Sequence, residues 1–272
     1  MKKTALLLFI ALAVPARPTL AAGASSMGHL VVVGGGAIPD EVLARAVALA
    51  GGASASVAIF PQASELADTG KRSIEMWQKA GVARAVEVPL ADPAAAIRMV
   101  DEATLIWFPG GDQNRLMQAL RNTGVPEAIR RSYRAGATVG GTSAGAAVMS
   151  GIMITGDADL QSITSGATKT ADGLGLWPEV IFDQHFLKRQ RQNRLISLVL
   201  DHPSLVGVGI DEQTAVVVTG SRFEIIGRSS VLVVDARKAK IEKRAAAQLS
   251  AARGIRMHVL TSGMIFDLRD FH

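Results

Sequence analysis

The sequence predicts an α/β protein in which a mainly parallel sheet is flanked by helices and extra antiparallel strands lie near the C-terminus. Short apolar runs without polar interruption recur along the chain, which is typical of parallel strands buried on both faces. Segments with a helical spacing of apolar residues alternate with these runs. In the C-terminal third, closely spaced apolar runs indicate antiparallel strands.

The expected elements follow one another in a regular order. Strands are predicted at residues 30–33, 55–60, 85–88 and 104–108, and helices at residues 41–50, 69–80, 94–100, 114–121 and 126–135. A short apolar strand then leads into a turn at Ser143, and an Ala-rich helix follows. Later strands are predicted at residues 180–182, 207–212, 215–218, 222–226 and 230–234. Since no linker interrupts this order, residues 23–272 are expected to form a single domain.

Residues 1–22 have the pattern of a secretory signal peptide. Lys2 and Lys3 form a basic start, an unbroken apolar stretch runs from Ala5 to Val14, and Ala21 and Ala22 offer small residues for cleavage. The apolar stretch is too short for a mature transmembrane helix. The alternative is an apolar N-terminal helix of the fold. We expect an exported protein, periplasmic or extracellular, whose mature form has no membrane segment.

Composition excludes several kinds of chemistry. The chain has no cysteine, so it has no disulfide, thiolate nucleophile or cysteine-bound metal. Three of its five net positive charges lie in residues 1–22, which leaves a charge of +2 that does not favour a nucleic-acid partner. Aromatic residues make up only 4% and do not alternate with basic ones.

Functional residues gather where predicted strands end, which is where ligand sites form in parallel sheets. The four candidate loops contain residues 34–36, residues 109–113, the turn at Ser143 and residues 183–186. The three glycines at 34–36 do not match a dinucleotide-binding fingerprint, and a P-loop lysine is absent.

The turn at Ser143 has the G-x-S-x-G spacing of a nucleophile elbow, from Gly141 to Gly145. Small neighbours are needed there because a sharp strand-to-helix turn leaves no room for Cβ atoms. The following helix would direct free N–H groups at a developing oxyanion. The alternative is a plain Gly-Ser turn between two buried elements.

A serine nucleophile needs a base and an acid that orients the base. His185 is the best candidate base, because it follows a predicted strand and precedes a group of arginines. Glu212, at the end of another buried strand, is the preferred acid. The other acids considered are Asp159, Asp183 and Asp211, and the other histidines are His29, His202, His258 and His272.

Four motifs together resemble cyanophycinase and its relatives among the serine exopeptidases that cleave next to aspartyl residues. The motifs are FPGGDQ at 108–113, GTSAGA at 141–146, DQHF at 183–186 with Arg189, Arg191 and Arg194 behind it, and GVGIDEQTA at 207–215. They occur in the family's order. The resemblance implies a fold similar to class I glutamine amidotransferase domains, a flavodoxin-like three-layer sandwich. It also implies a homodimer and peptide hydrolysis without a metal or other cofactor.

The resemblance also implies the roles of individual residues. Ser143 is the expected nucleophile, His185 the base and Glu212 the acid, an order that differs from that of the α/β-hydrolases. In smaller aspartyl dipeptidase relatives the acid lies between serine and histidine, where this chain has Asp157 and Asp159. The expected oxyanion hole uses the backbone N–H groups of Ala144 and of a glycine at 110–111, preferably Gly111. The expected substrate-binding residues are Gln113, Asp183, Gln184, Arg189 and Arg191.

The expected substrate is a peptide. The resemblance implies cyanophycin as this peptide. Cyanophycin is a poly-aspartate backbone with arginine on each β-carboxyl group, and the family releases β-aspartyl-arginine from it. Arginine side chains suit substrate carboxylates because the guanidinium offers a planar pair of donors. The alternatives are a related peptidase for other aspartyl or isoaspartyl peptides, and a binding protein that keeps the fold without catalysis.

Overall fold

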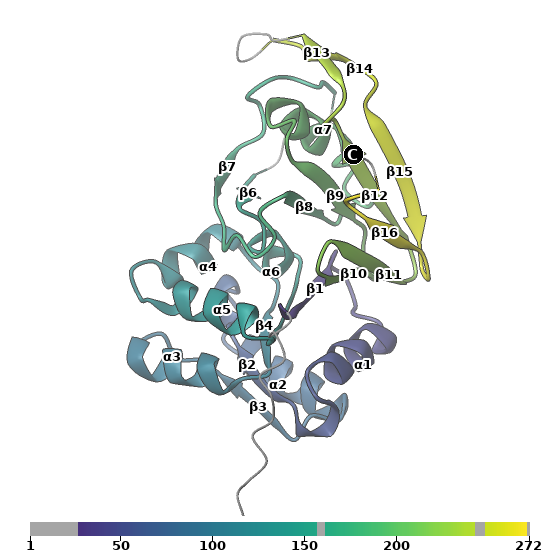
Figure 1. Ribbon diagram of the computed structural model, residues 1–272. Helices are drawn as coiled ribbons and strands as arrows, with labels where there is room; N and C mark the ends of the chain where they lie inside the picture. The colour runs from purple at the N-terminus through teal and green to yellow at the C-terminus, as the bar shows by residue number, and fades with distance from the viewer. Residues whose placement is uncertain (1–26, 157–160, 243–247, 271–272) are drawn as a thin grey trace, which may run out of the picture.

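The computed structural model describes residues 27–156, 161–242 and 248–270, which form two main β-sheets, two small hairpins and the covering helices (Figure 1). The predicted signal peptide at residues 1–22 lies outside the described residues. None of the helices that are described is long and apolar enough to cross a membrane.

The larger sheet has eight strands in the order β16-β11-β10-β1-β5-β4-β2-β3. Its parallel part consists of β1 (His29–Val33), β5 (Thr138–Thr142), β4 (Leu105–Phe108), β2 (Ser56–Ile59) and β3 (Arg84–Glu87). Its antiparallel edge consists of β10 (Thr214–Thr219), β11 (Arg222–Gly227) and β16 (Ile265–Asp267). The predicted α/β fold with added antiparallel strands is therefore confirmed.

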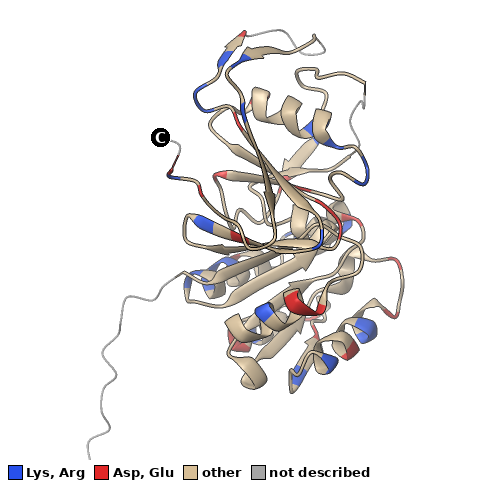
Figure 2. Cartoon of the chain, turned by 90° about the vertical axis from the view of Figure 1, so that its right-hand side faces the viewer, with Lys and Arg blue, Asp and Glu red and all other residues tan. Residues whose placement is uncertain are grey.

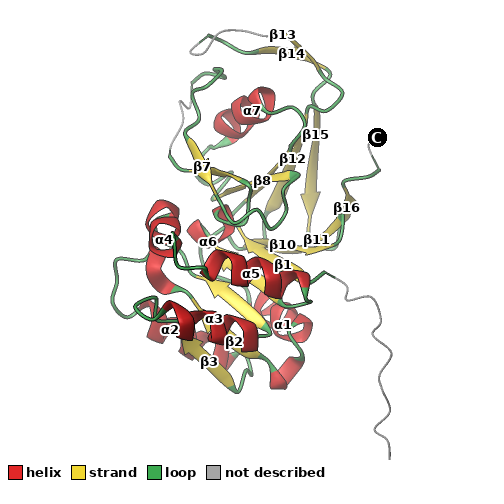
Figure 3. Ribbon diagram, turned by 60° about the vertical axis from the view of Figure 1, so that its left-hand side comes forward, coloured by secondary structure: helices red, strands yellow, loops and turns green. Residues whose placement is uncertain are grey.

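Helices cover both faces of this sheet because its central strands are apolar on both sides (Figure 3). Val31 and Val33 of β1 belong to the apolar cluster that includes residues of α1 (Asp40–Leu49) and α2 (Thr69–Lys79). Leu30 and Val32 belong to the opposite cluster, which is covered by α3 (Pro93–Glu102), α4 (Gln113–Leu120), α5 (Val125–Arg134) and the short α6 (Ala144–Ala147). Short 3₁₀ turns, η1 (Gly52–Ser54) and η2 (Pro61–Ala63), lie beside β2.

The second sheet was not expected from the sequence. It has four strands in the order β15 (Arg256–Thr261), β12 (Ser230–Asp235), β9 (Val206–Ile210) and β8 (Val180–Gln184). Although β12 follows β11 closely in sequence, it pairs with β9 and β15. Leu232 and Val234 of β12 pack with α7 (Gln192–Asp201), while Val231 and Val233 join the main core. Because both faces of β12 are apolar, the strand is stable where α7 covers one face and the main core covers the other.

Two small hairpins complete the fold, β6 (Ile152–Ile154) with β7 (Thr170–Asp172) and β13 (Lys240–Glu242) with β14 (Ala251–Arg253). Figure 2 shows charged residues mainly on helices and outer loops and few along the central strands. One apolar cluster contains residues from both sheets, including Val32, Phe182 and Val233. The sheets are thus joined by a continuous core.

Candidate active site

Ser143 lies in the sharp turn between β5 and α6, with backbone angles of φ 55° and ψ −112°. These angles are costly for a residue with a side chain, and such strain persists only where the surroundings enforce it. Close backbone packing at the flanking glycines holds the turn in this conformation. A Cβ on Gly141 would lie 2.6 Å from the carbonyl oxygen of Gly145, and a Cβ on Gly145 would lie 2.0 Å from that of Phe108. The G-x-S-x-G spacing is therefore a packing requirement of this turn.

His185 follows β8 and connects Ser143 to Glu212. Its Nε2 is 2.9 Å from the Ser143 Oγ, and its Nδ1 is 2.6 Å from Oε1 of Glu212, which lies just after β9. The serine comes from the larger sheet and the other two residues from the second sheet. The predicted nucleophile, base and acid are therefore brought together at the junction of the two sheets.

The glycines at 34–36, which follow β1, hold this junction together. The carbonyl oxygen of Gly34 accepts the His185 N–H at 2.6 Å, and that of Gly35 accepts the Gln213 N–H at 2.9 Å. A Cβ on Gly35 would lie 2.4 Å from the His185 ring, and one on Gly36 would lie 3.2 Å from the Cβ of Glu212. The sequence predicts only a strand-end loop at these glycines. The pattern of three glycines after a strand could have suggested close packing against another functional segment.

The environment of His185 favours the neutral imidazole. Burial lowers the pKa of His185 below the usual range for histidine, and the nearby cations of Arg189 and Arg191 act in the same direction. The hydrogen bond and negative charge of Glu212 oppose this shift without cancelling it. A general base must be unprotonated to accept a proton, so this balance keeps the imidazole competent into mildly acidic solution.

We expect Arg189→Gln to move the acidic limb of the pH profile of kcat/KM, which reports the free enzyme, to higher pH. Removing a cation stabilises the imidazolium, so the pKa of His185 rises and the base is lost at a higher pH. Profiles of the variant and wild type, measured at substrate concentrations well below KM, check this. Arg98→Gln, on the exposed surface of α3, is the control and leaves the limb in place. A limb that stayed fixed or moved to lower pH in Arg189→Gln would contradict the electrostatic assignment.

Backbone donors for an oxyanion lie beside the serine. The N–H of Ser143 itself is used, because it donates to the carbonyl oxygen of Val33 at 3.1 Å. Ala144 is the first residue of α6, so its N–H has no partner within the helix. The adjoining glycine loop is close, since a Cβ on Gly110 would lie 3.4 Å from the Cβ of Ser143. Gly111 has a φ of 145°, and a Cβ there would lie 2.2 Å from the Ala63 carbonyl oxygen.

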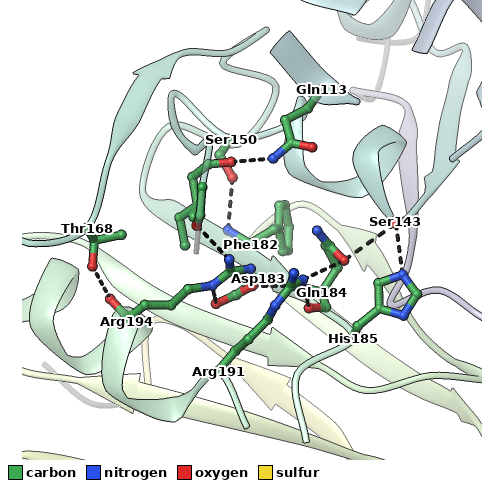
Figure 4. Close-up of polar contacts among 12 residues, drawn as sticks. Gln113, Ser143, Ser150, Thr168, Phe182, Asp183, Gln184, His185, Arg191 and Arg194 are labelled. Atoms are coloured by element: carbon green, nitrogen blue, oxygen red, sulfur yellow. Dashed lines mark hydrogen bonds and ion pairs between the residues drawn. The ribbon is translucent and has the colours of Figure 1, made fainter. Parts of the chain in front are cut away.

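The predicted substrate-binding residues occupy different environments (Figure 4). The buried Arg191 donates through Nη1 to the backbone oxygen of Gln184 at 2.8 Å and to its side-chain Oε1 at 2.9 Å. Oε1 of Gln184 is also 3.5 Å from the Ser143 Oγ. Gln113, at the start of α4, donates through Nε2 to the carbonyl oxygen of Ile154 at 2.9 Å. Arg189 is exposed beside the histidine.

Asp183 differs from the expectation of direct substrate contact. Its side chain is fully buried, and both of its oxygens accept from Arg194, one of them from Nε at 2.8 Å. Nη1 of Arg194 also donates to the carbonyl oxygen of Gly156 at 2.7 Å. Because its carboxylate is enclosed in this pair, Asp183 has a structural part in place of the substrate contact that the resemblance implies.

Within the part of the chain that the structure describes, the other candidate acids and histidines do not contact the imidazole. Asp211 accepts the backbone N–H groups of Leu187 and Lys188 through Oδ1, at 3.1 and 2.9 Å, and the Ser229 hydroxyl through Oδ2 at 2.7 Å. It thereby fastens the turn that follows His185. His29 lies near the Thr219 hydroxyl and His258 packs on Phe266. His202 follows α7. Asp157, Asp159 and His272 lie outside the described residues.

We expect Asp211→Ala to lower kcat about tenfold or more with little change in KM. The loss of its three hydrogen bonds frees the turn that aims the imidazole, and small misplacements of a catalytic group cost rate. Steady-state kinetics check this, with thermal unfolding measured alongside. Asp201→Ala is a matched control, because Asp201 also accepts a serine hydroxyl and a backbone N–H, from Ser165 and Gly166. Equal kcat losses in both variants would show that only general stability had changed.

The fold and the site define a hydrolase of the serine type, built on an α/β sandwich. A sequence profile of Peptidase family S51 matches residues 30–226. The chain belongs to this family and is a serine-type peptidase. The resemblance inferred from the four motifs is therefore confirmed.

Similar proteins cover most of the chain. The cyanophycinase of Geminocystis herdmanii is 38% identical over 237 residues, which covers 82% of this chain and 86% of that protein. The cyanophycinase of Trichormus variabilis is 36% identical, covering 84% and 80%. Among solved structures, a peptidase from an acI-B1 Actinobacterium superposes with a TM-score of 0.63 at 22% identity, covering 90% of this chain and 98% of that one. At that identity the superposition supports the fold alone.

Proposed function

We propose that this protein hydrolyses cyanophycin and releases β-aspartyl-arginine dipeptides. The observation that carries the proposal is the identity of 34–38% to cyanophycinases over more than four fifths of the chain. The arrangement of Ser143, His185 and Glu212 supports it, because it supplies the parts that peptide hydrolysis needs.

In the proposed reaction, the Ser143 Oγ attacks the scissile carbonyl carbon while Nε2 of His185 takes the hydroxyl proton. The backbone N–H groups of Ala144 and Gly111 stabilise the oxyanion. His185 then gives its proton to the leaving nitrogen, the C–N bond breaks, and an acyl-enzyme remains. Water attacks this ester with His185 again as the base, and the proton returns to Ser143. Glu212 holds the imidazole in one tautomer and stabilises the imidazolium.

The charges around the serine suit this substrate. Each cyanophycin repeat carries a guanidinium and the free α-carboxylate of its arginine. We propose that the exposed Arg189 pairs with a substrate carboxylate, and that the side-chain amides of Gln113 and Gln184 form hydrogen bonds with the substrate. Arg191 acts through Gln184, which it fixes with two hydrogen bonds.

We also propose that residues 1–22 direct export, because their basic start and apolar stretch fit a signal peptide. Fractionation of cells that express the full chain tests this, and retention of uncleaved protein in the cytoplasm contradicts it. The homodimer stays a prediction, which sedimentation of the purified protein tests.

The activity is tested by incubating purified protein with cyanophycin and measuring β-aspartyl-arginine by mass spectrometry. Short α-aspartyl and β-aspartyl peptides run in parallel. Release from cyanophycin that is absent in Ser143→Ala supports the proposal. Rapid cleavage of α-linked dipeptides with cyanophycin left intact points instead to a related aspartyl peptidase. Failure of a serine-directed inhibitor to label Ser143, together with no cleavage, points to a binding protein.

A further inference from the structure

A groove of about 770 Å³ lies between α4 and the β6–β7 hairpin, and no step of the proposed reaction uses it. Its floor includes the apolar Met117, Ile152 and Met153, and its rim includes Asn114, Arg121 and Asp172. In Figure 1 the hairpin lies directly above α4. The groove is thus a cleft with an apolar base and a polar, charged edge, as ligand sites commonly are.

The groove is connected to the active site through the start of α4. Gln113, a proposed substrate contact, and its neighbour Asn114 both donate side-chain hydrogen bonds to β6 and the residue after it, at the carbonyl oxygens of Ile154 and Thr155. These bonds, of 2.9 and 3.3 Å, fix the near end of the groove against the site. An elongated ligand on this face therefore contacts the same helix that carries Gln113.

The two rim charges have no ion-pair partner among the described residues. Arg121 and Asp172 are both exposed, and within the part of the chain that the structure describes neither forms an ion pair, with the other or with any third residue. The neighbouring helix α5 differs, because its Arg130 and Arg131 are paired with Glu127 and Asp101 at 2.7 and 2.6 Å. One cation and one anion thus face solvent on opposite walls of the same groove.

We propose that this groove is a second binding site for the polymeric substrate, which rests on the proposed function. Each repeat of the polymer carries one guanidinium and one carboxylate. Asp172 pairs with a guanidinium and Arg121 with a carboxylate of a repeat remote from the scissile bond. The apolar floor accommodates the methylene groups of the arginine side chains. The groove thereby keeps a long chain on the enzyme between successive cleavages.

The test compares long and short substrates in the variant Arg121→Gln/Asp172→Asn. We expect kcat/KM for soluble cyanophycin to fall about three- to tenfold, the effect of two partly exposed charge contacts, with the difference shrinking at high salt. For a substrate of two repeats kcat/KM stays unchanged, because the scissile bond lies between them and neither repeat is remote from it. Arg98→Gln/Asp270→Asn, which removes an exposed Arg and an exposed Asp from other surfaces, is the matched control and behaves as wild type.

Equal activity of variant and wild type on the polymer overturns the proposal that the groove binds the polymer, while leaving the proposed function intact. A fall of the same size on both substrates also overturns it, because the effect then lies in the catalytic step. Should the wild type cleave neither substrate, the proposed function fails. Binding through the groove is measured separately, by co-sedimentation of Ser143→Ala protein with insoluble cyanophycin. Adding Arg121→Gln and Asp172→Asn to this protein should reduce the bound fraction, and an unchanged bound fraction overturns the inference.

Discussion

Ser143→Ala is expected to lower kcat by about 10³- to 10⁶-fold, the range found when a triad serine is removed. The substitution deletes the atom that forms the acyl bond, and neither the oxyanion donors nor Glu212 can replace it. Release of β-aspartyl-arginine measures the effect. His185→Ala should lose a similar factor, and the double variant should be hardly worse than either single one, because a nucleophile and its base act as a unit.

Folding should survive these substitutions. The alanine in Ser143→Ala keeps the positive φ of the turn, near the 55° of the serine, so the stability of the variant stays close to that of wild type. Ser143→Gly should unfold at a higher temperature than Ser143→Ala, because glycine adopts this conformation without strain. Unchanged turnover with normal thermal unfolding in Ser143→Ala would refute the assignment of the nucleophile.

The largest expected effect on stability comes from Asp183→Ala, at about 3–5 kcal/mol in the free energy of unfolding. Removing this carboxylate takes away two hydrogen bonds and an ion pair that the buried guanidinium of Arg194 makes with it. Urea unfolding of wild type and variant measures the difference. The matched control is Asp101→Ala, which breaks the exposed pair with Arg131 and should cost no more than about 1 kcal/mol.

A double variant distinguishes the loss of the ion pair from the effect of changing residue 183 itself. Asp183→Leu with Arg194→Met removes both charges together, so the double variant should recover much of the stability that Asp183→Ala loses. A loss in Asp183→Ala no greater than that in Asp101→Ala would mean that the buried pair does not support this part of the fold. It would also return Asp183 to the set of possible substrate contacts.

Most elements of the fold could be predicted because their signals are local. The alternation of buried runs with helical spacing located the strands and helices around β1 to β5 to within one or two residues, and Gly or Pro often marked their ends. The helix α7, which begins at Gln192, and the strands β15 and β16 were not predicted. Exposed Met257, Val259 and Ile265 on these two strands obscure the pattern expected of a covered strand.

The candidate site was less evenly predictable. Ser143 carries a spacing that packing imposes on its own turn, so a short segment was enough to find it. The choice of Glu212 over Asp211 was not local, because the two acids are adjacent and both follow β9. In the structure Glu212 faces the imidazole, whereas Asp211 accepts backbone N–H groups of the turn that follows His185.

The sequence by itself determined the α/β class, the turn at Ser143, His185 as the proposed base, and the family resemblance. Each depends on residue types at short spacing, which local backbone sterics and side-chain burial dictate. Only the tertiary structure decided that β8, β9, β12 and β15 form a second sheet, that Asp183 pairs with Arg194, and that Gly34 to Gly36 hold the imidazole and Glu212 in place. These features depend on which distant segments pack together, because a buried charge or a close backbone contact exists only once both sides of it have met.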